Sequence, residues 1–315
     1  MNNTYDFLSI LSDDEKTALQ LSSLYSKEGY EKYRMSKFEE YDLYGNYKDF
    51  LVSEKVIAFI DTDGRFLALK PDVTLSIIKN YRDNFDLQTK IYYKENVYRV
   101  SGKTGSFKEI MQVGLERLGF IDDAAITEVL SLAARTLDEI SDRSVLEISS
   151  LSIVSSILDS TGLSELGRKE ILRYLGEKNL QGALGVCERE SLDKSAVLSV
   201  KTLVTLYGEP EKLKELYSLP CCDAALRAEI DRFITVADAI SKCDTKCRIS
   251  LDFSVVNDMD YYNGFVFRGF VEGAPSSVLS GGQYDRLMKK MNKKSGAIGF
   301  AVYIDELSRL GGGKL

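Results

Sequence analysis

The sequence has 315 residues, of which 48 are acidic and 41 are basic, so its formal net charge is −7. It contains no histidine. This excludes His-dependent catalytic triads, imidazole general bases, histidine metal ligands and histidine pH switches. The acidic balance argues against a free-standing nucleic-acid binder, because such proteins normally carry a basic surface.

The cysteines and the apolar runs indicate a cytoplasmic protein without a metal site. The five cysteines lie in the second half of the chain without a Cys-x-x-Cys pair, which suggests neither a disulfide framework nor a zinc ribbon. No run approaches the ~20 apolar residues of a membrane span, and the N-terminus lacks the pattern of a signal peptide. We therefore expect no membrane contact and reduced cysteines.

Local patterns predict alternating helices and strands in the first part of the chain. Ser12 and Glu15 form a capping box before a helix that ends at Gly29. Strands at 56–60 and 66–69 flank an Asp-Gly turn and predict a hairpin. The remaining elements expected here are a short helix from Pro71-Asp72, strands at 90–100 and 108–118, a helix over 126–140 behind Asp122-Asp123, and a strand at 145–148.

The character of the sequence changes in the second half. Residues 152–246 are rich in Leu, Glu, Lys and Ala and predict several short helices. Strands are expected again at 248–256 and 262–271, Gly281-Gly282 is expected to open a loop, and residues 298–310 predict a strand followed by a helix. The pattern predicts an α+β fold with an antiparallel sheet flanked by helices. Its core domain would comprise 1–150 plus 248–315, and 151–247 would form a helical insertion.

Five segments in chain order carry a resemblance to a known family. They are residues 60–74, 97–100, 111–116, 260–264 and 281–285, the last followed by Ile298-Gly-Phe-Ala. Together they resemble the catalytic core of histidyl-tRNA synthetase, which has a class II aminoacyl-tRNA synthetase fold built on an antiparallel sheet. The resemblance extends over nearly all of residues 10–310.

The resemblance implies a binding site for histidine. Asp72, Thr74 and Gln112 would hold the ammonium group, and Glu116 would accept a hydrogen bond from a ring N–H. The other residues assigned to this site are the second-motif arginine and the tyrosines that would wall the ring: Arg99, Tyr261, Tyr262 and Tyr284. Carboxylates and hydrogen-bonding aromatics suit a zwitterion with a protonatable ring.

Structural roles for the same residues remain open alternatives. Asp72 could be a helix cap, Gln112 and Glu116 could be solvent-facing strand positions, and the tyrosine pair could be strand residues with one ring in the core.

Departures from the family pattern argue against catalysis. Adenylate formation needs cations around the triphosphate, and the family supplies them mainly as arginines. Here Val100-Ser101 replaces His-Glu, Lys108 is the loop cation that remains, Asn257 replaces a catalytic arginine, and Glu306 replaces an arginine expected on ATP. We expect no catalytic residues. The chain also ends soon after this motif, so we expect neither an anticodon-binding domain nor a tRNA partner.

A retained amino-acid pocket without an ATP site resembles a paralogous family, the regulatory subunits of short-form ATP phosphoribosyltransferase. This resemblance implies a non-catalytic chain without a cofactor, which binds a separate catalytic subunit and makes it responsive to histidine in the first step of histidine biosynthesis. A homodimer within a larger hetero-oligomer is expected through residues 29–47, although Ser36 stands where the family has proline. The bound histidine could lie in the synthetase-like pocket or at a subunit interface.

Two other functions remain as alternatives. The first is a truncated synthetase-like ligase that activates an amino acid with ATP. The second is a synthetase-derived scaffold or RNA-associated protein with a vestigial pocket.

Overall fold

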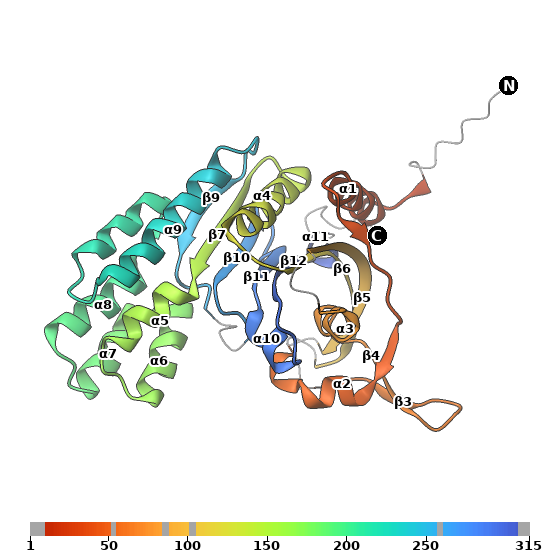
Figure 1. Cartoon of the computed structure of the whole chain (residues 1–315), viewed down its shortest axis with the longest axis horizontal. Helices are drawn as coiled ribbons and strands as arrows, with labels where there is room; N and C mark the ends of the chain where they lie inside the picture. The colour runs from red at the N-terminus through yellow and green to blue at the C-terminus, as the bar shows by residue number, and fades with distance from the viewer. Residues whose placement is uncertain (1–9, 52–54, 84–87, 101–104, 257–260, 308–315) are drawn as a thin grey trace.

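The computed structural model describes residues 10–51, 55–83, 88–100, 105–256 and 261–307 (Figure 1). Within these residues a nine-stranded sheet forms the centre of the molecule. Its strands, in spatial order, are β1 (Glu31–Lys32), β5 (Thr89–Val100), β6 (Phe107–Gly119), β12 (Gly296–Tyr303), β11 (Leu279–Gln283), β10 (Phe265–Val271), β7 (Ser144–Ser150), β9 (Arg248–Asp252) and β8 (Tyr207–Gly208). The predicted antiparallel pairing is confirmed for the central strands, whereas β1–β5 and β7–β9 pair in parallel.

A small second sheet has the order β2 (Phe38–Glu40), β4 (Phe66–Leu69), β3 (Ala58–Ile60), and its β3–β4 hairpin projects from the body of the molecule (Figure 1). The expected Asp-Gly turn is confirmed. Gly64 has φ 86°, and the Asp63 carboxylate accepts a hydrogen bond from the Arg65 amide at 3.1 Å. Short helices α2 (Tyr41–Asn46) and η2 (Lys48–Phe50) follow β2.

Helices α1 (Asp13–Lys27), α4 (Asp123–Ile140) and α11 (Ile304–Leu307) cover one face of the sheet. The capping box at Ser12 is confirmed, and Asp122 caps α4 through the amide of Ala125. The apolar stripes of α1 and α4 pack together around a buried hydrogen bond of 3.1 Å between Tyr25 and Thr136.

On the other face of the sheet, α3 (Thr74–Asn80) and α10 (Asp285–Lys290) enclose a second apolar cluster. Leu75 and Ile78 of α3 and Leu287 of α10 meet Tyr93 of β5 there. This face also carries the cavity described below.

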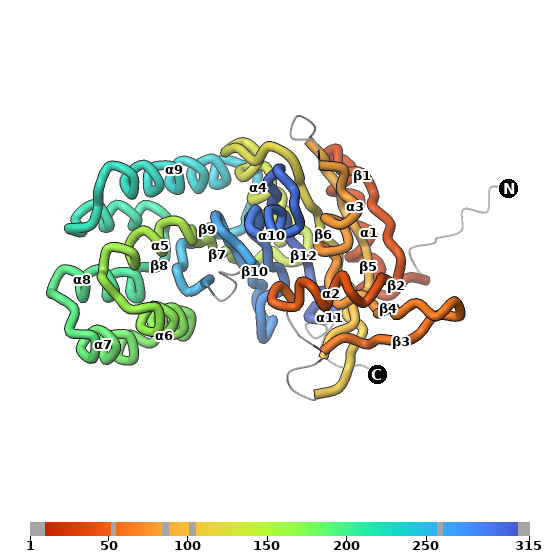
Figure 2. Tube along the Cα trace, turned by 60° about the horizontal axis from the view of Figure 1, so that its bottom comes forward, coloured from red at the N-terminus to blue at the C-terminus, as the bar shows by residue number. Residues whose placement is uncertain are grey.

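The predicted helical segment extends from the far end of the sheet, as the two views show (Figures 1 and 2). Its elements are α5 (Leu151–Asp159), α6 (Glu165–Gly176), α7 (Leu180–Arg189), α8 (Lys194–Thr205), η3 (Pro210–Ser218) and α9 (Ala224–Ser241). Helix α9 packs against α4, and its Phe233 ring stacks on Phe265 of β10 at 5.3 Å. No helix of the described chain is both long and apolar enough to cross a membrane.

The loop expected at Gly281-Gly282 is wrong, because both residues lie inside strand β11. A Cβ on Gly281 would lie 2.3 Å from the carbonyl oxygen of Gly299, so the glycines permit close strand packing rather than a turn. The strand expected over 248–256 ends at Asp252, whose carboxylate accepts a hydrogen bond from the Ser254 amide at 2.8 Å and turns the chain. The strand expected from residue 262 begins at Phe265.

Candidate functional site

A cavity of about 350 Å³ lies between the sheet and helix α3. All eight residues assigned to the site from the sequence line this cavity, although they come from five separate segments of the chain: Asp72, Thr74, Arg99, Gln112, Glu116, Tyr261, Tyr262 and Tyr284. The structure therefore brings the complete predicted set together.

The floor of the cavity is one face of strands β6 and β12. Their register pairs Glu116 with Gly299, Gly114 with Ala301 and Gln112 with Tyr303. Because alternate residues of a strand point to the same side, the floor has Glu116 at one end, small residues in the middle, and Gln112 at the other end.

Glu116 is buried and fully engaged by hydroxyl groups. It is 2% exposed, and its two carboxyl oxygens accept hydrogen bonds from Thr74 at 2.9 Å and from Tyr284 at 2.6 Å. Burial raises the pKa of Glu116 to about 8, against these two hydrogen bonds, and the nearby charge of Asp72 raises it further. A solvent-facing role for Glu116 is therefore wrong.

Asp72 both caps α3 and carries charge into the cavity. Its Oδ1 accepts a hydrogen bond from the Leu75 amide at 2.9 Å, which confirms the predicted cap, and its Oδ2 lies 3.4 Å from the Arg99 guanidinium. Arg99 also donates to the carbonyl oxygen of Pro71 at 2.6 Å. Burial raises the pKa of Asp72, whereas Arg99 and the backbone amides of α3 oppose this rise.

Gln112 has a buried donor without a partner. Its side chain is 2% exposed, so the solvent-facing alternative is wrong here too, and its Nε2 has no hydrogen-bond partner among the described residues. A buried amide N–H left unpaired costs roughly 1–3 kcal/mol. A ligand with an acceptor atom at this end of the cavity would remove that cost.

Aromatic side chains form the walls. The ring of Tyr261 lies 4.6 Å from that of Tyr262 and 5.9 Å from that of Tyr284, and burial raises the pKa of Tyr261 and Tyr284 well above the ordinary value. Both therefore stay protonated and offer neutral hydroxyl groups. The tyrosine pair lies before β10 rather than within a strand.

Sequence reasoning missed several lining residues: Tyr93, Ser280, Tyr303, Asp49 and Phe50 of η2, and Leu51, which follows η2. The register of β5 places Tyr93 opposite Gly114, where a Cβ on the glycine would lie 2.5 Å from the Tyr93 hydroxyl. Because Gly114 lies midway between Gln112 and Glu116 on β6, strand alternation would have placed it on the cavity face. Its neighbour Tyr93 on β5 could not be identified in this way, because that contact depends on the pairing register of the two strands.

Cations are scarce in this cavity. Of the described residues that line it, Arg99 is the one cation, and it is already paired with Asp72. Lys108 is exposed on β6, and the Glu306 carboxylate accepts a hydrogen bond from Ser276 at 3.0 Å. The substitutions at Ser101 and Asn257 lie outside the described residues. Within the described chain no group of three or more Cys, Asp or Glu is placed to hold a metal ion.

Comparisons with known proteins agree with this architecture. The sequence model of the family described as histidyl-tRNA synthetase matches residues 11–307. An ATP phosphoribosyltransferase regulatory subunit from Oceanobacillus iheyensis is 25% identical over 297 residues, which cover 92% of this chain and 72% of the relative.

Two solved structures share the fold. A Bacillus halodurans C protein described as an ATP phosphoribosyltransferase regulatory subunit/histidyl-tRNA synthetase has a TM-score of 0.81 at 23% identity, covering 95% of this chain and 79% of that one. A chain of the ATP phosphoribosyl transferase (HisG:HisZ) complex from Thermotoga maritima has a TM-score of 0.73 at 17% identity, covering 93% and 98%. The class II synthetase-like α+β fold is thus confirmed. Since the family model spans nearly the whole sequence, the chain belongs to the histidyl-tRNA synthetase family.

Proposed function

We propose that this chain is a non-catalytic regulatory subunit of ATP phosphoribosyltransferase, which binds the short-form catalytic subunit and makes it responsive to histidine. The observation that carries the proposal is the cavity, which groups two buried carboxyl groups and five tyrosines but has a single, already paired cation among its described lining residues. The names of the relatives reported above support the same role.

The charge of the cavity fits a small zwitterion. Burial raises the pKa of both Asp72 and Glu116, because it disfavours their charged forms. A cation placed beside either residue would stabilise its carboxylate. The ammonium group of histidine would lie at Asp72, Thr74 and the Gln112 amide oxygen. Its ring would lie between Tyr261, Tyr262 and Tyr284, with a ring N–H directed at Glu116.

The same cavity is poorly suited to ATP. A transferring phosphoryl group needs several oriented cations, and each oriented donor contributes on the order of 3 kcal/mol to the transition state. Arg99 is held by Pro71 and Asp72, Lys108 is exposed, and Glu306 is an acid. We infer that the chain does not form aminoacyl-adenylates and needs no cofactor.

Regulation requires that histidine bind one state of the assembly more tightly than another, because equal affinity for both would shift nothing. We propose that the chain acts as a homodimer within a larger hetero-oligomer in the cytoplasm. Its core would be 1–150 plus 248–315, and its helical insertion 151–247.

Copurification with a short-form catalytic subunit tests this proposal. We expect the complex to form, the phosphoribosyl transfer rate to depend on this chain, and histidine to inhibit the complex. D72N should keep the complex but lose histidine inhibition, whereas D63N, which alters an exposed acid of the β3–β4 turn, should change neither. A complex that forms but ignores histidine would refute the sensing role.

Because the chain belongs to the histidyl-tRNA synthetase family, the alternative that it activates an amino acid with ATP also needs a test. If the chain alone exchanges pyrophosphate into ATP when a free amino acid is added, it is a synthetase and the non-catalytic assignment is wrong. We expect no exchange above background.

A further inference from the structure

Tyr303 lines the cavity at the end of its floor opposite Glu116. It is the last residue of β12 and pairs with Gln112 in the sheet register, so both side chains lie on the cavity face. The Tyr303 hydroxyl shares a hydrogen bond of 2.6 Å with Ser280 Oγ of β11, and its amide donates to the Val278 carbonyl oxygen at 2.9 Å. Hydrogen bonds to the hydroxyl group and to the backbone amide therefore fix the position of the Tyr303 ring.

The floor that leads to Tyr303 is made of small residues. On the cavity face of β12, Gly299 and Ala301 precede Tyr303, and on β6 Gly114 lies between Glu116 and Gln112. Four residues of strand span about 13 Å. The Glu116 carboxyl group already lies over Gly299, and the Tyr93 hydroxyl lies over Gly114. The length left for a ligand is therefore shorter than this span, and a ligand that extends along the floor past Ala301 meets the Tyr303 ring.

The buried Gln112 Nε2 lies at this closed end and has no partner among the described residues. A donor in that position calls for an acceptor on the ligand. If the ligand's ring lies at Glu116, its α-carboxylate is the group that reaches Gln112.

We propose that Tyr303 and Gln112 restrict this site to amino acids with a free, unextended α-carboxylate. Tyr303 blocks any extension beyond the carboxyl carbon, and Gln112 donates a hydrogen bond to the carboxylate. The inference rests on the proposed function, because it takes histidine as the ligand.

Calorimetric titration of the full chain tests the proposal with three ligands: L-histidine, L-histidinamide and the dipeptide His-Gly. We expect wild type to bind His-Gly roughly a hundredfold more weakly than histidine, since a closed pocket rejects added atoms. Tyr303→Val should reduce that ratio to tenfold or less. Tyr303→Phe keeps the ring and should retain the wild-type ratio. Gln112→Leu should lose most of the preference for histidine over histidinamide.

The outcomes distinguish a failure of closure by Tyr303 from a failure of the proposed histidine binding. Wild-type affinity for His-Gly within threefold of that for histidine corresponds to about 0.7 kcal/mol, which is less than one lost methylene contact. Such a result would overturn the closure by Tyr303 without any variant. So would a Tyr303→Val protein that binds histidine, keeps the wild-type melting temperature and still rejects His-Gly. Absence of histidine binding to wild type would overturn the proposed function, and this inference with it.

Discussion

Glu116 carries its proton at neutral pH because it is buried, and this has a consequence for stability. Its pKa is about 8 in the folded chain against an ordinary 4.5. Between these two values the folded state holds a proton that the unfolded state has released. The free energy of unfolding therefore falls as pH rises from 4.5 to about 8 and changes no further above that value.

E116Q should remove this pH dependence, because glutamine resembles the protonated acid and cannot ionise. We expect E116Q to match wild type near pH 5 and to exceed it by roughly 4 kcal/mol in free energy of unfolding near pH 9. Urea denaturation at the two pH values measures the difference. E272Q, which alters an exposed glutamate, is the matched control, and an E116Q gain of equal size at both pH values would contradict this account.

How far single residues could be predicted depended on whether a local pattern fixed them. Asp72, Thr74, Gln112 and Glu116 were assigned from short segments, and the structure places all four in the cavity. Tyr303 was not assigned to the site from the sequence. Its place in the cavity wall follows from the pairing of β6 with β12, which no local pattern in either strand encodes.

Among the elements, β11 shows how glycine can mislead sequence reasoning. Two adjacent glycines usually indicate a turn, yet Gly281 lies in a central strand between β10 and β12. A Cβ there would lie 2.3 Å from the Gly299 carbonyl oxygen and 2.5 Å from the Phe300 side chain. The glycine is required by the neighbouring strand rather than by a turn.

G281A should therefore destabilise the chain. Overpacking of a close-packed core costs about 1–3 kcal/mol, and backbone atoms cannot move aside cheaply. G185A on helix α7 is the matched control, because a Cβ at Gly185 meets nothing within 4 Å and alanine favours the helix. Chemical denaturation of both variants measures the difference, and equal stabilities would show that β11 adapts to the added methyl group.

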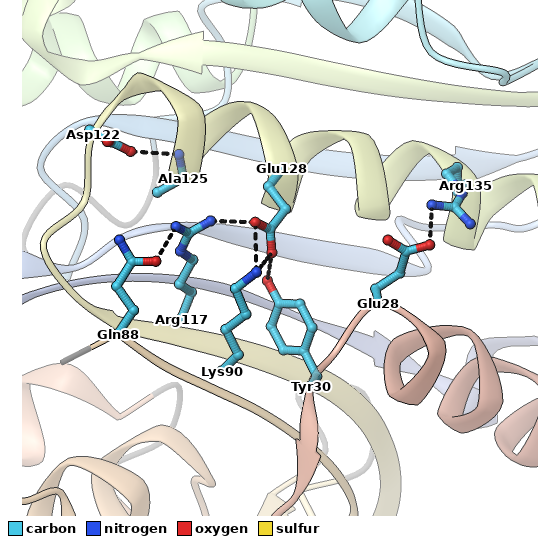
Figure 3. Close-up of polar contacts among 9 residues, drawn as sticks. All are labelled: Glu28, Tyr30, Gln88, Lys90, Arg117, Asp122, Ala125, Glu128 and Arg135. Carbon is cyan, nitrogen blue, oxygen red and sulfur yellow. Dashed lines mark hydrogen bonds and ion pairs between the residues drawn. The ribbon is translucent and has the colours of Figure 1, made fainter.

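A polar cluster fixes helix α4 to the strand pair β5–β6 (Figure 3). The Glu128 carboxylate accepts hydrogen bonds from Tyr30 at 2.9 Å, Lys90 at 2.9 Å and Arg117 at 2.5 Å, and Arg117 is also bonded to Gln88 at 2.6 Å. Arg117 is 5% exposed, so its charge depends on Glu128 for compensation.

E128Q should leave the Arg117 charge without its counter-ion. Removal of one partner of a buried pair costs about 3–5 kcal/mol, and the partial exposure of Glu128 reduces this to about 2 kcal/mol. E139Q, on an exposed position of the same helix, should change the free energy of unfolding by less than about 0.5 kcal/mol. Adding R117M to E128Q should recover most of the loss, and a loss that persists would place the effect elsewhere.

The overall fold was predictable where the spacing of apolar residues was regular. It was less predictable where strands that are far apart in the sequence pair with each other. The capping box of α1, the stripe of α4 and the β5–β6 pair all lie where the sequence places them. The parallel pairing of β7 with β9 was not predicted, because the whole of residues 151–247 lies between the two strands and neither strand carries a signal for the direction of its partner.

The helical segment and the sheet share one hydrophobic core, which bears on how the chain unfolds. Phe233 of α9, Phe265 of β10 and Leu137 of α4 belong to a single apolar cluster that also reaches Ile171 of α6. A segment that folds independently has a core of its own. We therefore expect residues 151–247 to unfold together with the sheet in one transition.

Two optical signals test this expectation. Far-UV circular dichroism follows all helices, whereas tyrosine fluorescence follows mainly the core, because only Tyr174, Tyr207 and Tyr217 lie in residues 151–247. The urea transitions should coincide, and F233A should move both by the same amount, about 3–5 kcal/mol. L198A, at a half-exposed leucine of α8, should move neither appreciably. If F233A shifted only the dichroism transition, or if the two transitions separated in wild type, the insertion would have a free energy of unfolding of its own. It could then move as a unit relative to the core. Regulation through a second subunit would use such a movement.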